Sequence, residues 1–178
     1  MKVFLAGATG ALGKRLVPQL VERGHTVVGT TRSEAKEPIL WDLGAQPVVL
    51  DALDEKAVRE AVGAAKPDAI VHQLTALTNI DFRKFEKSFE LTNQLRMYGT
   101  DYLLAAAGEA GVKRFVAQSY AGWPSARNGS RVVTETDPFD PDPAPQTRTA
   151  VEALKHLENA VTGTEGIEGI VLRYGGFY

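Results

Sequence analysis

The sequence contains no cysteine and has no large excess of charge of either sign. Without cysteine there can be no disulfide framework, thiolate zinc site or cysteine nucleophile. The formal net charge of -2 provides no basic field for nucleic acid or an anionic membrane surface. No apolar run approaches the ~18 residues of a membrane span. The N-terminus also lacks the features of a signal peptide. We therefore expect a cytoplasmic protein without nucleic-acid or membrane partners.

Metal chemistry is also not expected. The three histidines are scattered along the chain and are not accompanied by paired carboxylates, the arrangement that a metal site requires.

The 178 residues suffice for one domain, and short β-rich runs alternate along them with longer amphipathic patterns. This alternation implies right-handed crossovers and a parallel sheet. We predict an α/β fold, a Rossmann-like doubly wound parallel sheet with helices on both faces. The expected strands span 3–6, 26–30, 47–50, 69–74, 114–118 and 167–172. The expected helices span 12–23, a short segment capped by Ser33, 54–65 with Asp54 as N-cap, 83–110 and 147–161.

Residues 120–145 are rich in Pro, Gly, Ser and Asp and show little periodicity. We expect a long loop there, and loops of this length in compact domains are usually functional or mobile.

A glycine-rich turn separates the first expected strand from the first expected helix. In its GxxGxxG pattern, Gly7 allows the sharp exit from the strand, Gly10 lets the backbone approach a pyrophosphate, and Gly13 lets helix and sheet pack closely. Free N–H groups at the helix start would meet the phosphates. The alternative is a purely structural turn of another α/β fold. The predicted phosphate-binding residues are Gly7, Thr9, Gly10, Ala11, Leu12 and Gly13.

The end of the second expected strand bears on the choice of cofactor. NAD sites usually place an acidic side chain there, whereas an Arg accommodates the additional phosphate of NADP. No Asp or Glu occurs between Val27 and Ser33, but Arg32 does. We therefore predict that Arg32 and Ser33 contact the cofactor and that NADP is preferred, with NAD possible. The alternative is that Arg32 is simply solvated.

Six segments together resemble the short-chain dehydrogenase/reductase superfamily, in its extended or atypical NAD(P)-dependent epimerase/dehydratase branch. The resemblance covers the whole chain, and each segment alone is modest, but the six occur in the family's order. They are the glycine turn 7–13, Val49–Ala52, Ile70–Thr75, Asn93 with 99–106, Arg114–Ser119 and Leu172–Tyr178.

The resemblance implies further cofactor contacts. Asp51 would hydrogen-bond the adenine amino group with Ala52 beside it, although Asp51 could instead be an ordinary turn residue. Leu74 and Thr75 would line the adenosine ribose and the phosphates. The stretch from Tyr174 to Phe177 would approach the nicotinamide.

The catalytic pattern of the superfamily is a Tyr-x-x-x-Lys pair with a Ser or Thr, and this chain departs from it. No Tyr-x-x-x-Lys occurs anywhere in the sequence. Alignment of the last helix through Glu152 places Arg148 at the lysine position and Ala144 at the tyrosine position. Arg148 could hold the ribose and supply positive charge, but it cannot readily deliver a proton. It could equally be a surface residue of the helix.

Ser119 and Tyr120 are expected to follow the fifth strand, where strand ends face the ligand crevice. One of them falls at the family's Ser/Thr position. Tyr120 could replace the missing acid/base, or it could pack against Trp123 as an apolar lid.

Two functions remain open from the sequence. The first is an NAD(P)-dependent oxidoreductase or epimerase/dehydratase acting on a small polar substrate, a nucleotide sugar or a carbonyl compound. The second is a non-catalytic NADP-binding sensor. By resemblance, a substrate domain would follow Tyr178, and helices 83–110 and 147–161 could pair across a two-fold axis in a homodimer.

Overall fold

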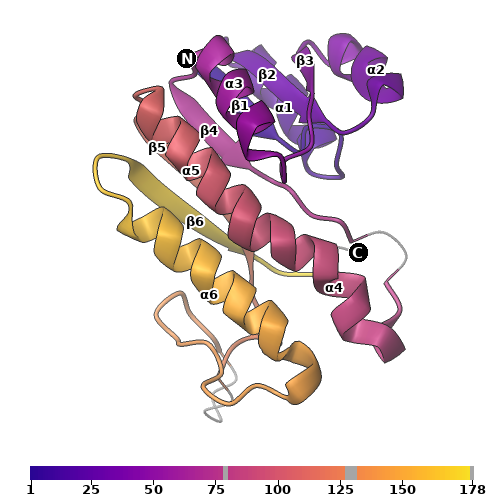
Figure 1. The fold of residues 1–178 in the computed structure, drawn as a ribbon, viewed down its shortest axis with the longest axis vertical. Helices are drawn as coiled ribbons and strands as arrows, with labels where there is room; N and C mark the ends of the chain where they lie inside the picture. Colours follow the sequence, from indigo (N-terminus) through magenta and orange to yellow (C-terminus); the bar gives the residue numbers. More distant parts are fainter. Residues whose placement is uncertain (78–79, 127–131, 177–178) are drawn as a thin grey trace.

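The computed structural model describes residues 1–77, 80–126 and 132–176, and its centre is a six-stranded sheet (Figure 1). The strand order is β3-β2-β1-β4-β5-β6 and every neighbouring pair is parallel. This is the Rossmann order, in which the direction of winding reverses between β1 and β4. The strands are β1 (Lys2–Ala6), β2 (Thr26–Thr31), β3 (Gln46–Val49), β4 (Ala69–His72), β5 (Arg114–Tyr120) and β6 (Glu168–Tyr174).

Helices cover both faces of the sheet, as predicted, and α5 and α6 lie side by side over one of them (Figure 1). Alternate residues of each strand point to opposite faces. Phe4 accordingly joins a core cluster with residues of α3, α5 and α6, whereas Leu5 joins a second cluster with residues of α1 and α2. The helices are α1 (Gly13–Glu22), α2 (Glu37–Asp42), α3 (Glu55–Ala65), α4 (Phe85–Gln94), α5 (Thr100–Glu109) and α6 (Arg148–Gly163).

Local signals account for two of the helix boundaries. The Asp54 side chain accepts a hydrogen bond from Ala57 N at 3.1 Å, which confirms it as the N-cap of α3. Gly24, with φ +77°, follows the C-cap of α1 and ends that helix. Ser33 occupies the N-cap position of the 3-10 turn Glu34–Lys36, but its side chain makes no capping hydrogen bond.

The predicted strand ends differ from the observed ones by one residue for β2 and β3 and by two residues for β4, β5 and β6. β4 ends at His72, earlier than predicted, whereas β5 and β6 run two residues further than predicted. The cause is mutual pairing, since Ser119 lies opposite Arg173 and Tyr120 opposite Tyr174. Ser119 and Tyr120 are therefore the last residues of a strand rather than the first residues of a loop.

The predicted helix 83–110 is interrupted by a π-helical turn. Residues Leu95–Gly99 form this turn between α4 and α5. A π turn adds one residue to a helical turn, and such turns occur frequently at functional sites. The 3.6-residue apolar pattern continues through the turn and did not reveal it. No helix in the described ranges has both the length and the hydropathy to cross a membrane.

The long loop after β5 is paired with itself. Ser125 and Phe139 form an isolated antiparallel bridge, and Ala126 N donates to Pro138 O at 3.0 Å. The loop then enters α6 through the 3-10 turn Pro145–Thr147.

Candidate cofactor site

The glycine turn leaves β1 at the carboxyl edge of the sheet, and close contacts explain two of its glycines. Gly7 has φ +90°, and a Cβ there would lie 2.8 Å from the carbonyl oxygen of Gln73. A Cβ on Gly13 would overlap the carbonyl oxygen of Gly7 and lie 2.5 Å from that of Ala8. A Cβ on Gly10 would meet only Gly7 O, at 3.2 Å, so Gly10 faces outward. The backbone is therefore accessible at Gly10, as a pyrophosphate requires.

Strand β2 holds this turn in place. Gly7 N donates to Thr30 Oγ1 at 3.0 Å, and Ala8 N donates to Thr30 O at 3.2 Å. Gly29 leaves room for the Ala8 side chain, since a Cβ on Gly29 would lie 2.8 Å from Ala8 Cβ. The position of the turn is thus set by hydrogen bonds to Thr30 and by the close approach of Ala8 to Gly29.

The turn presents unpaired donors. In the described part of the chain, the N–H groups of Ala11 and Leu12 have no hydrogen-bond acceptor. They immediately precede α1, where the helix dipole concentrates partial positive charge. Free amides beside an accessible glycine backbone match the oxygens of a pyrophosphate. These residues therefore fit a dinucleotide.

The end of β2 lies next to the turn. Thr9 Oγ1 is 3.4 Å from Thr31 Oγ1, and Thr31 Oγ1 accepts from Ser33 N at 3.2 Å. Arg32 is exposed, and it forms no ion pair with any residue that the structure describes. Arg32 is thus available to a ligand at this edge.

Asp51 and Ala52 follow β3, whose Val49 pairs with Thr31. Asp51 Oδ1 accepts from Leu53 N at 3.0 Å, so this carboxylate supports a local turn. Ala52 is buried. The turn contact agrees with the alternative considered for Asp51, and its adenine contact remains a prediction.

Strand β4 ends beside the glycine turn, because Gln73 N donates to Ala6 O at 2.9 Å. Leu74 is half-buried and Thr75 is exposed. The sequence analysis missed Gln73, whose side chain is buried and whose Oε1 has no partner in the described structure. A buried acceptor without a partner is costly and requires an explanation, and a bound ligand would supply one.

His72 is fully buried at the end of β4. Leu74 N donates to its Nδ1 at 3.2 Å, so its Nε2 carries the proton and bonds to Thr100 Oγ1 at 3.2 Å. Burial, opposed by a hydrogen bond to the Leu95 backbone and assisted by the Arg96 charge, lowers the pKa of His72 to about 4. His72 is therefore neutral at physiological pH and connects β4 to α5.

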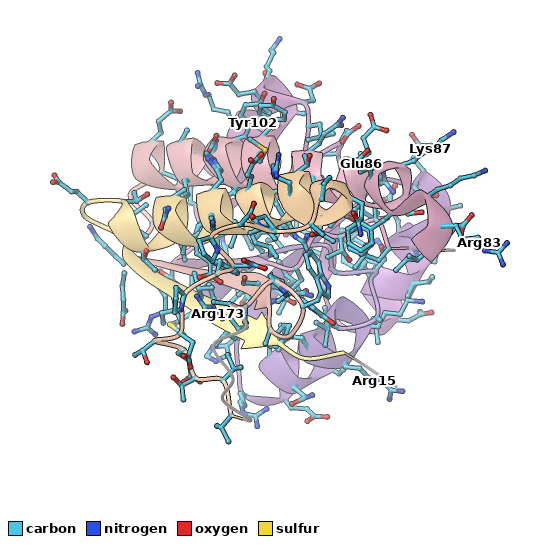
Figure 2. The ribbon with its side chains drawn as sticks, turned by 90° about the horizontal axis from the view of Figure 1, so that it is seen from below. Arg15, Arg83, Glu86, Lys87, Tyr102 and Arg173 are labelled. Atoms are coloured by element: carbon cyan, nitrogen blue, oxygen red, sulfur yellow. The ribbon has the colours of Figure 1, made fainter. Side chains whose placement is uncertain are left out.

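The Ser119 hydroxyl belongs to a network under α6. It donates to Glu158 Oε1 at 2.6 Å, and Glu158 forms a bidentate pair with Arg173 at 2.9 and 2.8 Å. The Glu158 hydrogen bonds raise the pKa of the Arg173 guanidinium, which lies below α6 (Figure 2). Arg173 also donates to the carbonyl oxygens of Glu135 and Asp137 in the long loop. The network therefore joins β5, β6, α6 and the loop.

Tyr120, on the opposite side of β5, meets an aromatic cluster. Its ring centroid is 5.9 Å from that of Trp123, which packs edge-on against Phe85 at 5.3 Å. The packing of Tyr120 against Trp123 is therefore observed, and an acid/base role remains a prediction. Tyr174 pairs with Tyr120 across the strands, and Phe177 lies outside the described residues.

Arg148 is the first residue of α6 and lies apart from this network. Its side chain is 53% exposed, with Nη2 3.8 Å from Asp142 Oδ1. The Ala144 carbonyl accepts from Thr147 N at 2.8 Å in the turn that precedes α6. Among the described residues, Arg148 pairs with Asp142, whereas Ser119 contacts Glu158 and Tyr120 contacts Trp123.

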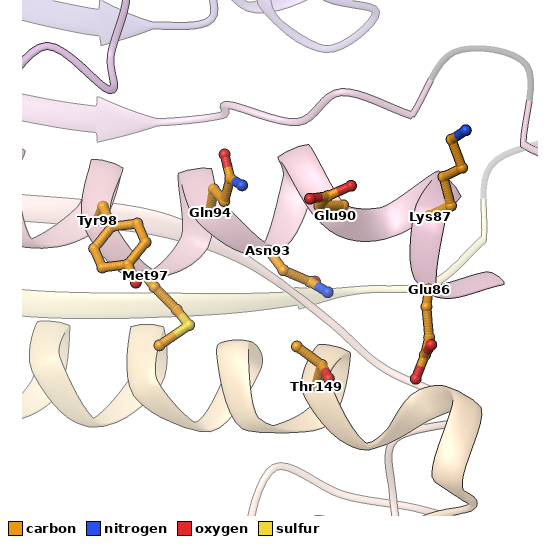
Figure 3. Close-up of a pocket in the computed structure, with 8 residues that line it drawn as sticks. All are labelled: Glu86, Lys87, Glu90, Asn93, Gln94, Met97, Tyr98 and Thr149. Atoms are coloured by element: carbon orange, nitrogen blue, oxygen red, sulfur yellow. The ribbon is translucent and has the colours of Figure 1, made fainter.

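Two grooves lie away from the glycine turn. One, of about 630 Å³, runs between α4 and α6, where Asn93 points toward Thr149 (Figure 3). The other, of about 680 Å³, lies beside the start of α3. Neither is lined by residues of the glycine turn. Within the described ranges, no three His, Asp or Glu side chains converge as metal ligands would.

The Rossmann strand order and a glycine turn with free amides at a helix start define a dinucleotide-binding domain. Residues 7–177 match the model of the NAD(P)H-binding family. The chain therefore belongs to that family, and its resemblance to the extended short-chain dehydrogenase/reductase superfamily is confirmed.

Known proteins agree with this assignment. The chain is 42% identical to the 3-diazoavenalumate denitrifying reductase of a Streptomyces species, in a match that covers all of this chain and 57% of the reductase. A second relative is a 4-hydroxy-2-methyl-3-oxo-4-farnesyl-3,4-dihydroquinoline-1-oxide ketoreductase of Stigmatella aurantiaca. The two sequences are 35% identical in a match that covers 65% of this chain and 32% of the ketoreductase. The fold matches UDP-glucose 4-epimerase from Bifidobacterium longum, in complex with NAD+ and UDP, with a TM-score of 0.76 at 18% identity, covering 98% of this chain and 53% of that one. The chain thus matches between 32% and 57% of the length of these relatives.

Proposed function

We propose that this chain is the cofactor-binding part of an NADP-preferring oxidoreductase that reduces a small polar carbonyl compound or acts on a nucleotide sugar. The observation that carries the proposal is the glycine turn, whose accessible backbone and free amides match a pyrophosphate. The bound dinucleotide would supply or accept the hydride. The reductase names of the relatives at 42% and 35% identity favour reduction over epimerisation.

The preference for NADP rests on Arg32. This exposed cation follows β2 beside Thr9 and Thr31, where the adenosine ribose would lie, and no acidic residue accompanies it there. A guanidinium can bind a 2′-phosphate with two donors, whereas a 2′-hydroxyl provides no charge to match.

A second candidate is a sensor that binds the cofactor without turnover. The observation in its favour is the position of Ala144 and Arg148, since the family's tyrosine is absent and Arg148 lies exposed beside Asp142. Under either function, a homodimer formed through α4, α5 and α6 remains a prediction.

Titration of the protein with NADPH and NADH tests the proposal. We expect tighter binding of NADPH, and we expect Arg32→Ala to reduce the NADPH affinity by about tenfold, the equivalent of ~1.4 kcal/mol, with little change for NADH. Arg23→Ala, at another exposed arginine near the end of α1, is the matched control. An unchanged affinity ratio in Arg32→Ala would refute the NADP assignment. Oxidation of bound NADPH across a panel of carbonyl compounds then separates enzyme from sensor.

A further inference from the structure

Arg96 is a buried cation without an acidic partner. It lies in the π-helical turn between α4 and α5, is 5% exposed and forms no ion pair in the part of the chain that the structure describes. Its Nη1 approaches Asn93 Oδ1 at 3.5 Å, which is long for a hydrogen bond from a guanidinium. Burial lowers the pKa of Arg96 to about 10, and no neighbouring carboxylate opposes that shift.

Two hydrogen bonds show which segment Arg96 faces. Four residues before it, Thr92 Oγ1 accepts from Ala76 N at 2.9 Å. Four residues after it, Thr100 Oγ1 is 3.2 Å from His72 Nε2. Residues four apart lie on the same helix face. Arg96 lies between these two contacts along the chain, and its charge helps to lower the pKa of His72, which places it near the end of β4.

The segment after β4 contains a buried polar atom without a partner. Gln73 is 6% exposed, and its buried Oε1 has no hydrogen-bond partner in the described structure. Burying a cation without a counter-charge, or an acceptor without a donor, is unfavourable. Both groups lie at the carboxyl end of the strand next to β1, where ligands bind in sheets of this order. The arrangement is explained if a bound ligand completes it.

We propose that Arg96 is an anion-binding residue whose guanidinium receives a carboxylate or phosphate group of a ligand at the carboxyl end of β4. This inference rests on the proposed function, because it places the anion at the cofactor site. The anion has two possible sources, a phosphate of the dinucleotide or an oxyanion of the substrate, and a guanidinium binds both with paired donors. Arg96 would then supply the buried positive charge that the exposed Arg148 does not.

The test replaces Arg96 by methionine, which has similar length and no charge. Affinities for NADPH and NADH are measured by calorimetry, and benzoate and inorganic phosphate are then titrated separately into NADP-saturated protein. We expect at least a tenfold loss of affinity in one of these two arms, dinucleotide binding or anion binding. The midpoint of thermal unfolding should be retained or raised, because a buried charge without a counter-charge has been removed. Arg96→Lys should retain part of the lost affinity, and Arg59→Met, at an exposed arginine of α3, should change nothing.

The two arms identify the source of the anion. A loss for both dinucleotides assigns it to the cofactor, and a loss for benzoate or phosphate assigns it to the substrate. Unchanged affinities in both arms overturn the inference alone, as does a failure to fold of both Arg96→Met and Arg96→Gln, since the guanidinium would then be a structural element. Wild-type protein that binds neither dinucleotide overturns the proposed function and this inference with it.

Discussion

The two halves of the site are built from different kinds of contact. In the β1–β2 half, the glycine turn is held by hydrogen bonds to the hydroxyl and carbonyl oxygens of Thr30 and by the absence of side chains at Gly7, Gly13 and Gly29. In the β5–β6 half, the charged side chains of Glu158 and Arg173 join β6 to α6 and to the long loop. The first half is therefore specified by where glycine stands, and the second by which side chains meet after folding.

The comparison predicts that adding a methyl group to the glycine turn causes the largest loss of stability. Gly13→Ala would place a Cβ against the carbonyl oxygens of Gly7 and Ala8, which cannot move without displacing α1 from the sheet. We expect a loss of about 4 kcal/mol in the free energy of unfolding, measured by urea denaturation, together with loss of dinucleotide binding. Gly63→Ala on α3 is the control, because its Cβ meets nothing within 4 Å. Equal stability of the two variants would contradict this account.

In the second half, the corresponding change is removal of one charge. Glu158→Gln keeps the shape of the side chain but leaves Arg173 without its bidentate carboxylate. The pair is only 18% and 14% exposed. We expect a loss on the order of 2–3 kcal/mol in the free energy of unfolding, and faster hydrogen exchange in residues 134–140, with dinucleotide affinity retained. Glu168→Gln breaks the more exposed pair with Arg114 and should cost less than about 1 kcal/mol. Comparable losses of stability in the two variants would show that the Glu158 network contributes no more than an exposed ion pair.

Strand β4 lies between the two halves, and its His72 predicts a pH dependence. The pKa of His72 is about 4 in the folded chain against 6.5 for an ordinary histidine. The unfolded chain therefore takes up this proton first as the pH falls, so folding loses stability below 6.5 and down to about 4. Between about pH 7.5 and about pH 5 we expect a loss of about 2 kcal/mol from this residue, measured by urea denaturation. His72→Gln should flatten the dependence of the unfolding free energy on pH, whereas the control His25→Gln should leave it unchanged. Identical pH profiles for wild-type protein and His72→Gln would contradict this prediction.

The smallest predicted effect is that of a helix cap in the first half. Asp54→Ala removes the acceptor for Ala57 N at the start of α3 and should cost about 1 kcal/mol in the free energy of unfolding. Asp54→Ser retains an acceptor and should restore most of the loss. Because the cap lies away from the glycine turn, dinucleotide affinity should not change. A large change in affinity would mean that the start of α3 is coupled to the cofactor site.

Much of the first half was predictable from sequence because its determinants are local. A strand, three spaced glycines and an amphipathic helix occupy residues 2–22 continuously, and strand β2 follows within a few residues. Period and turn chemistry therefore sufficed for the fold class and for the position of the glycine turn. The ends of β5 and β6 were wrong because each is extended by pairing with the other, which no local pattern records.

The sequence by itself determined the βα order, the positions of the glycines in the turn between β1 and α1 and the absence of the Tyr-x-x-x-Lys pair, since each of these depends on residue types at short spacing. Only the tertiary structure decided that Ser119 meets Glu158, that Arg148 stays exposed and that Arg96 is buried without an acidic partner among the described residues. Those outcomes depend on the packing of α4, the π turn and α6 against the ends of β4 and β5. A charge or an unpaired amide becomes energetically unfavourable only when it is removed from water, and burial is a property of the folded chain.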